Sequence, residues 1–273
     1  MMNRYLRGGL TLGALLTLAT LAAAQSSETI QNAALPGWTA SWKAWGPSTP
    51  PSVWLAPAAV LLDSGPLITH PGGGAGGLDA CRLQSTSLGM STLGFGHQIV
   101  NTISVADDFT VPVQWGLTQI TFFAYQTGST TTSTINEVRV QIWDGPPNGG
   151  GTVIFGDLTT NRLASTSFSN IYRETETTVG ATTRPIMAVV ATVATTLAPA
   201  TYWVEWQMAG TLASGPWAPP ITINGQATTG NGLQNLAGTW AAALDGGTGA
   251  PPQGFKFIIE GVSDLIFKDG FGA

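Results

Sequence analysis

From Phe95 onward the chain is a succession of short runs of β-branched and aromatic residues, each ended by Gly, Pro, Asn or Asp. Such side chains pack well on a pleated surface, and runs of this length are typical of strands. The alternation is strict over residues 135–143, where Val138, Val140 and Ile142 fall on one side. A period of two predicts a half-buried strand. The pattern therefore predicts an all-β fold.

The remaining strand-like runs are separated by turn-rich segments, among them a Gly/Pro loop over residues 64–78 and a long turn over residues 144–151. Many short strands with regular turns favour an antiparallel β-sandwich or jelly roll. We expect its other strands at residues 53–62, 107–111, 117–126, 153–155, 163–168, 171–174, 186–193, 202–208 and 255–262.

The flanking segments divide the chain. Residues 1–24 combine two arginines, an apolar run and small residues before a cleavage point, which is typical of a secretory signal peptide. The apolar run is shorter than the ~20 residues of a spanning helix, so we expect no transmembrane segment. Residues 25–95 are rich in Trp, Pro and Gly and predict an irregular N-terminal arm. Residues 96–262 form the predicted β-sandwich domain, and residues 263–273 form a C-terminal tail.

Composition limits the function. Charged residues make up only 9% of the chain and the net charge is −5. Because binding to phosphates requires a basic surface, this composition argues against a nucleic-acid partner. Cys81 is the single cysteine, which excludes an intramolecular disulfide and a cysteine-based zinc site. No catalytic motif surrounds His70 or His97, the two histidines. The sequence thus favours a non-catalytic protein over an enzyme.

Tryptophan gives the best indication of a ligand site. Trp115, Trp217 and Trp240 adjoin turn residues, and Trp203 shares a strand face with Glu205. An exposed indole stacks on a sugar ring, with polar groups beside it to fix the orientation. These five residues are the candidate ligand-binding set, and a polysaccharide is the ligand they suggest. Glycoside hydrolysis would need a second acid near Glu205, and packing of each indole in the core is the competing interpretation.

Four aspartates provide a second candidate site. Asp107, Asp108, Asp144 and Asp157 fall at strand ends or in loops. Ca²⁺ takes carboxylate and carbonyl oxygens as ligands, so these residues are the candidate calcium ligands. The competing interpretation is that their side chains accept hydrogen bonds from the local backbone of turns. No other cofactor is indicated.

Four segments, residues 106–112, 119–126, 140–147 and 202–206, resemble a recurring domain of secreted and cell-surface bacterial proteins. The resemblance implies a β-sandwich ectodomain without an assigned activity. The run Ile266-Phe267-Lys268-Asp269-Gly270-Phe271 is similar to a short I-F-x-D-G-F tail that closes many exported proteins. We therefore expect a secreted or cell-surface protein with a structural, adhesive or ligand-binding role, acting on polysaccharide or cell-envelope components. A carbohydrate-active module is the alternative.

Overall fold

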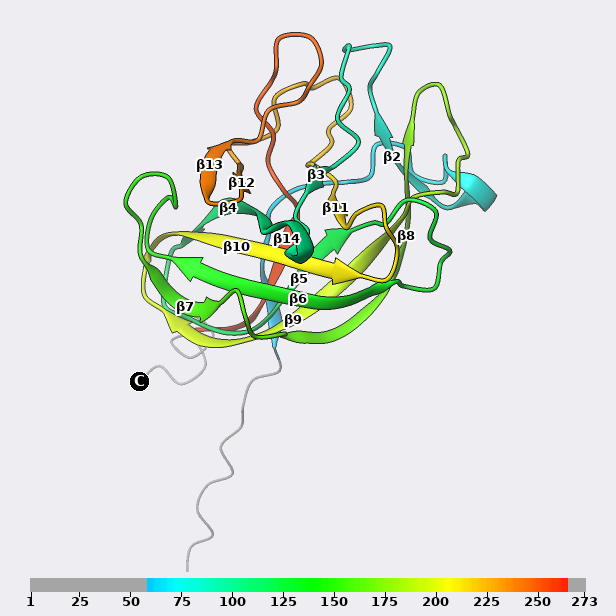
Figure 1. The fold of residues 1–273 in the computed structure, drawn as a ribbon. Coiled ribbons are helices and arrows are strands. Elements are labelled where there is room, and N and C mark those ends of the chain that lie inside the picture. Colours follow the sequence, from blue (N-terminus) through cyan, green and yellow to red (C-terminus); the bar gives the residue numbers. More distant parts are fainter. Residues whose placement is uncertain (1–57, 265–273) are drawn as a thin grey trace, which may run out of the picture. The chain divides into compact units, whose positions relative to one another are not determined.

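Two six-stranded β-sheets make up most of the computed structural model, which describes residues 58–264 (Figure 1). Within that range the only helical turns are the 3₁₀ segments η1 (Ala75–Gly77) and η2 (Ile99–Asn101). None of its helical segments has the length and hydropathy to span a membrane. The all-β prediction with antiparallel sheets is confirmed, and the sandwich or jelly-roll detail stays a prediction. The predicted signal peptide and the C-terminal I-F-x-D-G-F run lie outside the described residues.

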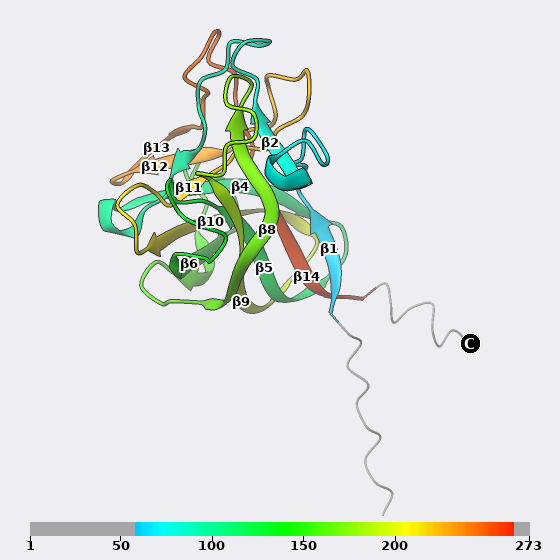
Figure 2. The same cartoon turned by 90° about the vertical axis from the view of Figure 1, so that its right-hand side faces the viewer.

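The first sheet has the strand order β1–β14–β5–β9–β8–β2 (Figure 2). All of its neighbours pair antiparallel except β2, which joins β8 in parallel. The strands are β1 (Ala59–Asp63), β14 (Phe257–Ser263), β5 (Trp115–Ala124), β9 (Pro185–Leu197), β8 (Leu163–Thr175) and β2 (Asp79–Leu83).

The second sheet has the order β13–β12–β4–β10–β6–β7, and every pair in it is antiparallel. Its strands are β13 (Thr239–Ala242), β12 (Leu233–Leu236), β4 (Ile103–Val111), β10 (Ala200–Gly210), β6 (Ile135–Trp143) and β7 (Val153–Asp157). A separate pair, β3 (Phe95–Gly96) with β11 (Trp217–Ala218), lies beside the two large sheets.

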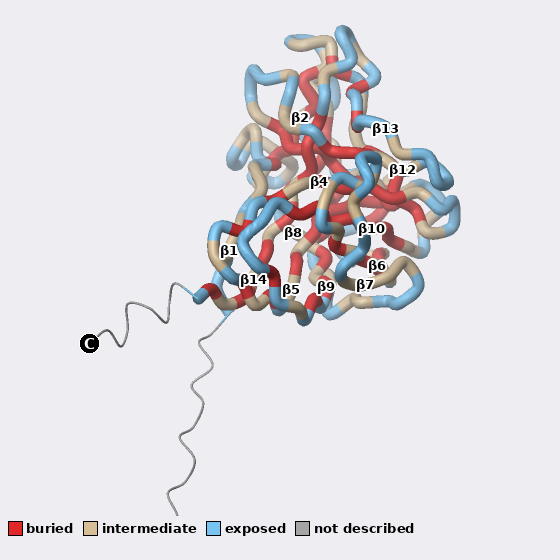
Figure 3. The backbone as a smooth tube through the Cα atoms, turned by 90° about the vertical axis from the view of Figure 1, so that its left-hand side faces the viewer, coloured by how far each residue is buried: buried red, intermediate tan, exposed pale blue. Residues whose placement is uncertain are grey.

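One apolar core joins the two sheets (Figure 3). Trp206 of β10 stacks on Phe122 of β5, with ring centroids 4.6 Å apart. Val138, Val140 and Ile142 of β6 are fully buried in the same cluster, as their alternation predicts. Burying a side chain of this size contributes roughly 1.5–3 kcal/mol, so the alternating runs fix the strand faces and hold the sheets together.

The segment assigned to an irregular arm contributes strands to the first sheet. β1 pairs with β14, and β2 pairs with β8. Leu67 and Cys81 are buried in a second apolar cluster that includes residues of β5, β8 and β9. The sequence obscures this role because residues 79–83 show no alternation and lie between glycine-rich loops. Residues 58–95 are therefore part of the same folded unit as the strands that follow.

Candidate functional site

Two adjoining pockets share Trp217 as a lining residue. The first, of about 580 Å³, is called the apolar pocket because its lining includes Val100, Ile103, Met208, Leu212, Pro216 and Leu236. The second, of about 310 Å³, is called the polar pocket because its lining includes Ser91, Thr92, Tyr125, Thr127, Arg184 and Ser214. Trp217 is partly buried, so part of its indole is open to solvent. A ligand in either pocket would therefore touch the same ring.

Backbone pairing fixes the position of Trp217. Its N–H donates to the carbonyl of Tyr125 over 2.9 Å, and its own carbonyl accepts from the Tyr125 N–H over 3.0 Å. On its other side it pairs with Gly96 of β3. Gly215 precedes it with φ +101°, and a Cβ there would lie 2.7 Å from Cδ1 of the indole. The ring takes its place only because residue 215 has no side chain.

Two glutamines hold the loop that carries this tryptophan, and a third holds the strand that pairs with it. The Nε2 of Gln98 donates to the Pro216 carbonyl over 2.7 Å, and that of Gln126 donates to the Leu212 carbonyl over 2.7 Å. The Nε2 of Gln234 donates to the Gly96 carbonyl over 2.8 Å. Gln98 and Gln126 are buried, so these bonds are shielded from water. A loop fixed in this way loses little conformational entropy when it binds a ligand.

Two buried charges set the opposite wall of the polar pocket. Asp245 accepts from the N–H groups of Ser91 and Thr92, each over 2.9 Å. The guanidinium of Arg173 donates to the carbonyls of Thr92 and Leu93 over 3.2 and 2.8 Å. Both charged groups form hydrogen bonds with backbone groups of this wall. Among the described residues, Arg184 is the charged one that lines this pocket, and no carboxylate lines either pocket.

No protein family, curated protein or solved structure matches this chain. The function is therefore inferred from the geometry of the site.

The structure does not bring the five predicted ligand residues together. Trp217 lines the pockets, whereas Trp115 is 5% exposed and packs in the main core. Trp203 and Trp240 lie in a separate cluster on the second sheet, beside Leu233. Trp203 is buried and Trp240 is partly buried. Of the predicted set, only Trp217 lines either pocket.

Glu205 lies in the second sheet, close to Trp143, and is not a lining residue of either pocket. One carboxylate oxygen accepts from Ser104 Oγ over 2.5 Å, and the other accepts from Trp143 Nε1 over 3.0 Å. Its burial raises the pKa of the carboxyl, and the two hydrogen bonds oppose that rise. With both oxygens engaged, this residue acts as a structural acceptor for its neighbours.

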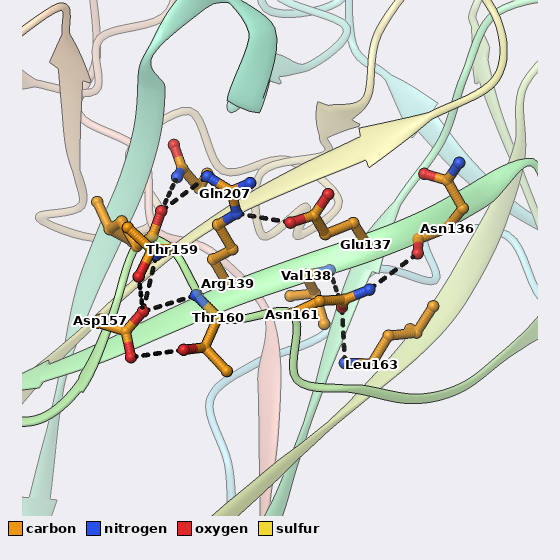
Figure 4. Close-up of polar contacts among 11 residues, drawn as sticks. Asn136, Glu137, Val138, Arg139, Asp157, Thr159, Thr160, Asn161, Leu163 and Gln207 are labelled. Carbon is orange, nitrogen blue, oxygen red and sulfur yellow. Dashed lines mark hydrogen bonds and ion pairs between the residues drawn. The ribbon is translucent and has the colours of Figure 1, made fainter.

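The four predicted calcium ligands are not grouped into one site among the described residues. Asp157 accepts from the N–H and hydroxyl groups of Thr159 and Thr160, which lowers its pKa (Figure 4). Asp144 accepts in the same way from Thr152, and its pKa is lowered for the same reason. These two side chains follow the competing interpretation of turn acceptors. Within residues 58–264, no three His, Cys, Asp or Glu side chains are grouped as metal ligands.

Asp107 and Asp108 point to different environments. Asp107 pairs with Val204 across the strands and is 5% exposed. Its Oδ2 accepts from the Phe255 N–H over 2.6 Å, and its Oδ1 accepts from the Asp108 N–H over 3.0 Å. Burial raises the pKa of Asp107 to about 7. Asp108 is partly exposed on the neighbouring position of β4.

Sequence reasoning missed Tyr125, Gln98 and Arg184. The run Ser214-Gly215-Pro216-Trp217 is a turn signal that points to Trp217. No motif near Arg184 in the sequence indicates a binding role. The residues that form the pocket with it come from distant parts of the chain.

Proposed function

We propose that this chain is an exported, non-catalytic protein that binds a glycan at Trp217. The observation that carries the proposal is that one partly exposed indole lines two adjoining pockets. The apolar face of a sugar ring packs on an indole, while its hydroxyls seek polar partners at the ring edge. The apolar pocket supplies the first kind of contact and the hydroxyl groups of the polar pocket supply the second.

A binding role is favoured over hydrolysis. Glycoside hydrolysis uses two carboxyl groups about 5–9.5 Å apart across the scissile bond. The lining of the two pockets contains no carboxylate, and Glu205 is engaged with Ser104 and Trp143 elsewhere. The proposal therefore assigns no bond-breaking step to this site.

Residues 1–24 support the choice of ligand. A secretory signal peptide directs a protein to compartments where polysaccharides and cell-envelope glycans are abundant. A protein that holds such a glycan would serve an adhesive role at the cell surface or in the medium.

Depletion of the full chain from solution by a panel of insoluble polysaccharides, and by cell envelopes, tests the proposal. We expect at least one polysaccharide to bind the wild type, and we expect Trp217→Ala to weaken that binding at least ~10-fold, as for a central aromatic contact. Trp240→Ala is the matched control, since it removes a partly buried indole that lines neither pocket. It should bind as the wild type does.

Near-UV circular dichroism and urea unfolding check that both variants fold, and Trp217→Phe provides a ring of smaller area with partial retention of affinity. The proposal is wrong if no polysaccharide depletes the wild type. It is equally wrong if Trp240→Ala, and not Trp217→Ala, loses binding.

A further inference from the structure

Arg184 differs from every other cation in residues 58–264. The other five arginine and lysine side chains in that range have partners inside the protein. Arg82, Arg139, Arg162 and Lys256 form ion pairs, and Arg173 donates to two carbonyls, a thiol and a hydroxyl. No described group forms a hydrogen bond or ion pair with the guanidinium of Arg184, although this residue is partly buried and lines the polar pocket.

We propose that the glycan bound at Trp217 carries a carboxylate, and that Arg184 binds this group in the polar pocket. The ligand class is a polyuronate, a polymer of sugars whose C6 is a carboxylate. This inference rests on the proposed function and adds the chemical class of the ligand.

Backbone contacts hold Arg184 at the pocket. Its carbonyl accepts from the Arg173 N–H over 2.9 Å, and Pro185 begins β9 immediately after it. The guanidinium thus projects from a strand end that is fixed by the first sheet. A planar guanidinium with parallel N–H donors matches a carboxylate in two hydrogen bonds.

Tyr125 provides a second, independent observation. Its side chain is 2% exposed and lines the polar pocket. Its hydroxyl lies against Gly94, since a Cβ on that glycine would be 2.8 Å from it, and no described group forms a hydrogen bond with this hydroxyl. The hydroxyl retains some exposed surface in the polar pocket, so it is free to form a hydrogen bond with a ligand there. A ligand oxygen would supply the missing acceptor.

The ionisation of Tyr125 agrees with that role. Burial raises the pKa of the phenol to about 12, while the charges of Arg173 and Arg184 oppose the rise. The hydroxyl therefore stays protonated near neutral pH and is a donor. A carboxylate accepts from both a guanidinium and a phenol, so the two residues suit one anionic group.

The charge around the pocket is consistent with an anion despite the net charge of −5. Asp245, the acid behind the wall, is taken up by the N–H groups of Ser91, Thr92 and Gly247. Arg173 lies behind the same wall and offsets it. Charges beyond ~8–10 Å are screened at physiological ionic strength. The charge that a ligand meets in the polar pocket is therefore set by Arg184.

Affinity measurements on matched polymers test the inference. Polygalacturonate, alginate and a glucuronan are each compared with the carboxyl-reduced, neutral form of the same polymer, using the full chain. We expect at least one polyuronate to bind ~10-fold more tightly than its neutral form, as for a hydrogen-bonded charge pair. Arg184→Gln should lose this preference.

Arg139→Gln is the matched control, since it removes the same charge from the second sheet, where Arg139 pairs with Glu137. It should retain the preference. Tyr125→Phe should reduce the preference in part, because it removes only one donor.

The outcomes separate the two proposals. Equal affinity for acidic and neutral polymers in wild type and Arg184→Gln overturns the carboxylate assignment and leaves glycan binding at Trp217 intact. Absence of binding to every polymer, acidic or neutral, overturns both. Equal loss of preference in Arg139→Gln shows a general charge effect, and tighter binding to polyglutamate shows an acidic peptide ligand. Either result overturns the assignment.

Discussion

Asp107 places an ionisable carboxyl at the edge of the main core, where burial raises its pKa from 3.8 to about 7. Between those two pH values the folded protein keeps a proton that the unfolded chain has released. Stability contributed by this residue is therefore present below about pH 4 and is lost as the pH rises to 7.

We predict that Asp107→Asn removes this dependence. As the pH rises from 4 to 8, the free energy of unfolding of the wild type should fall by on the order of 3 kcal/mol relative to that of the variant. Urea unfolding at a series of pH values measures it. Parallel pH profiles for the two proteins would contradict the prediction.

His97 changes the stability with pH in the opposite direction. Burial lowers its pKa from 6.5 to about 4, and its Nε2 has no partner within the described part of the chain. The unfolded chain then binds the proton first, so stability is complete above pH 6.5 and falls as the pH drops to 4. As the pH falls over that range, the wild type should lose about 3 kcal/mol of free energy of unfolding through His97, and His97→Gln should not show this loss.

The same unfolding series tests His97→Gln. Between about pH 4 and 6.5 the slopes of Asp107 and His97 oppose each other, so the wild type should have a flatter profile than either single variant. A steeper wild-type profile would contradict this assignment.

At the scale of single elements, Gly261 of β14 lies where the neighbouring strand leaves no room for a side chain. A Cβ on this glycine would lie 2.2 Å from the Gly116 carbonyl of β5, at a register shift between the two strands. We predict that Gly261→Ala lowers the free energy of unfolding by about 2 kcal/mol or more, because the strands would have to separate.

Gly145→Ala is the control for that prediction. A Cβ there would meet Gly151 at 3.5 Å, an ordinary contact, and the position lies in a turn. Chemical denaturation of both variants should show a loss only for Gly261→Ala. Equal losses would mean that the close approach in β14 relaxes without cost.

Elements were predictable where one face is buried. The run over residues 135–143 coincides with β6, because its alternation is the direct result of packing against the core. Residues 163–168 and 171–174 belong to one strand, β8, interrupted by Asn170 with φ 64°. β12 and β13 escaped prediction because four-residue strands with polar positions carry no clear period.

The site was less predictable than the fold for the same physical reason. A tryptophan beside turn residues is exposed only if the tertiary structure leaves it uncovered, which is the case for Trp217 and not for Trp115. Within residues 58–264, Arg184 is distinguished by having no hydrogen-bond or ion-pair partner for its guanidinium, which depends on every segment that surrounds it. Pairing between distant segments, rather than local pattern, creates both features.

At the scale of the whole molecule, strands from residues 58–95 and from the rest of the chain form one sheet. β1 and β2 are its outer strands, and Leu67 and Cys81 are buried in the second apolar cluster. We predict that a chain of residues 96–273 will not unfold cooperatively, because it lacks these strands and exposes the apolar surface they cover.

A chain of residues 58–273 is the control and should unfold in a single transition. Circular dichroism and tryptophan fluorescence, followed in urea, compare the two chains. A cooperative transition for residues 96–273 would show that the shorter piece is an independent domain, as the sequence boundary at residue 96 implies.

The pairing of β1 with β14 also determines how the folded unit responds to force. The strands run antiparallel, with Ala59 opposite Gly261, so the chain enters and leaves this unit at the same end of one ladder (Figures 1 and 2). Tension between the two flanking segments would open that ladder one pair at a time, as in a zipper, against single hydrogen bonds of about 1 kcal/mol each. A load carried through only one flank would leave the ladder closed.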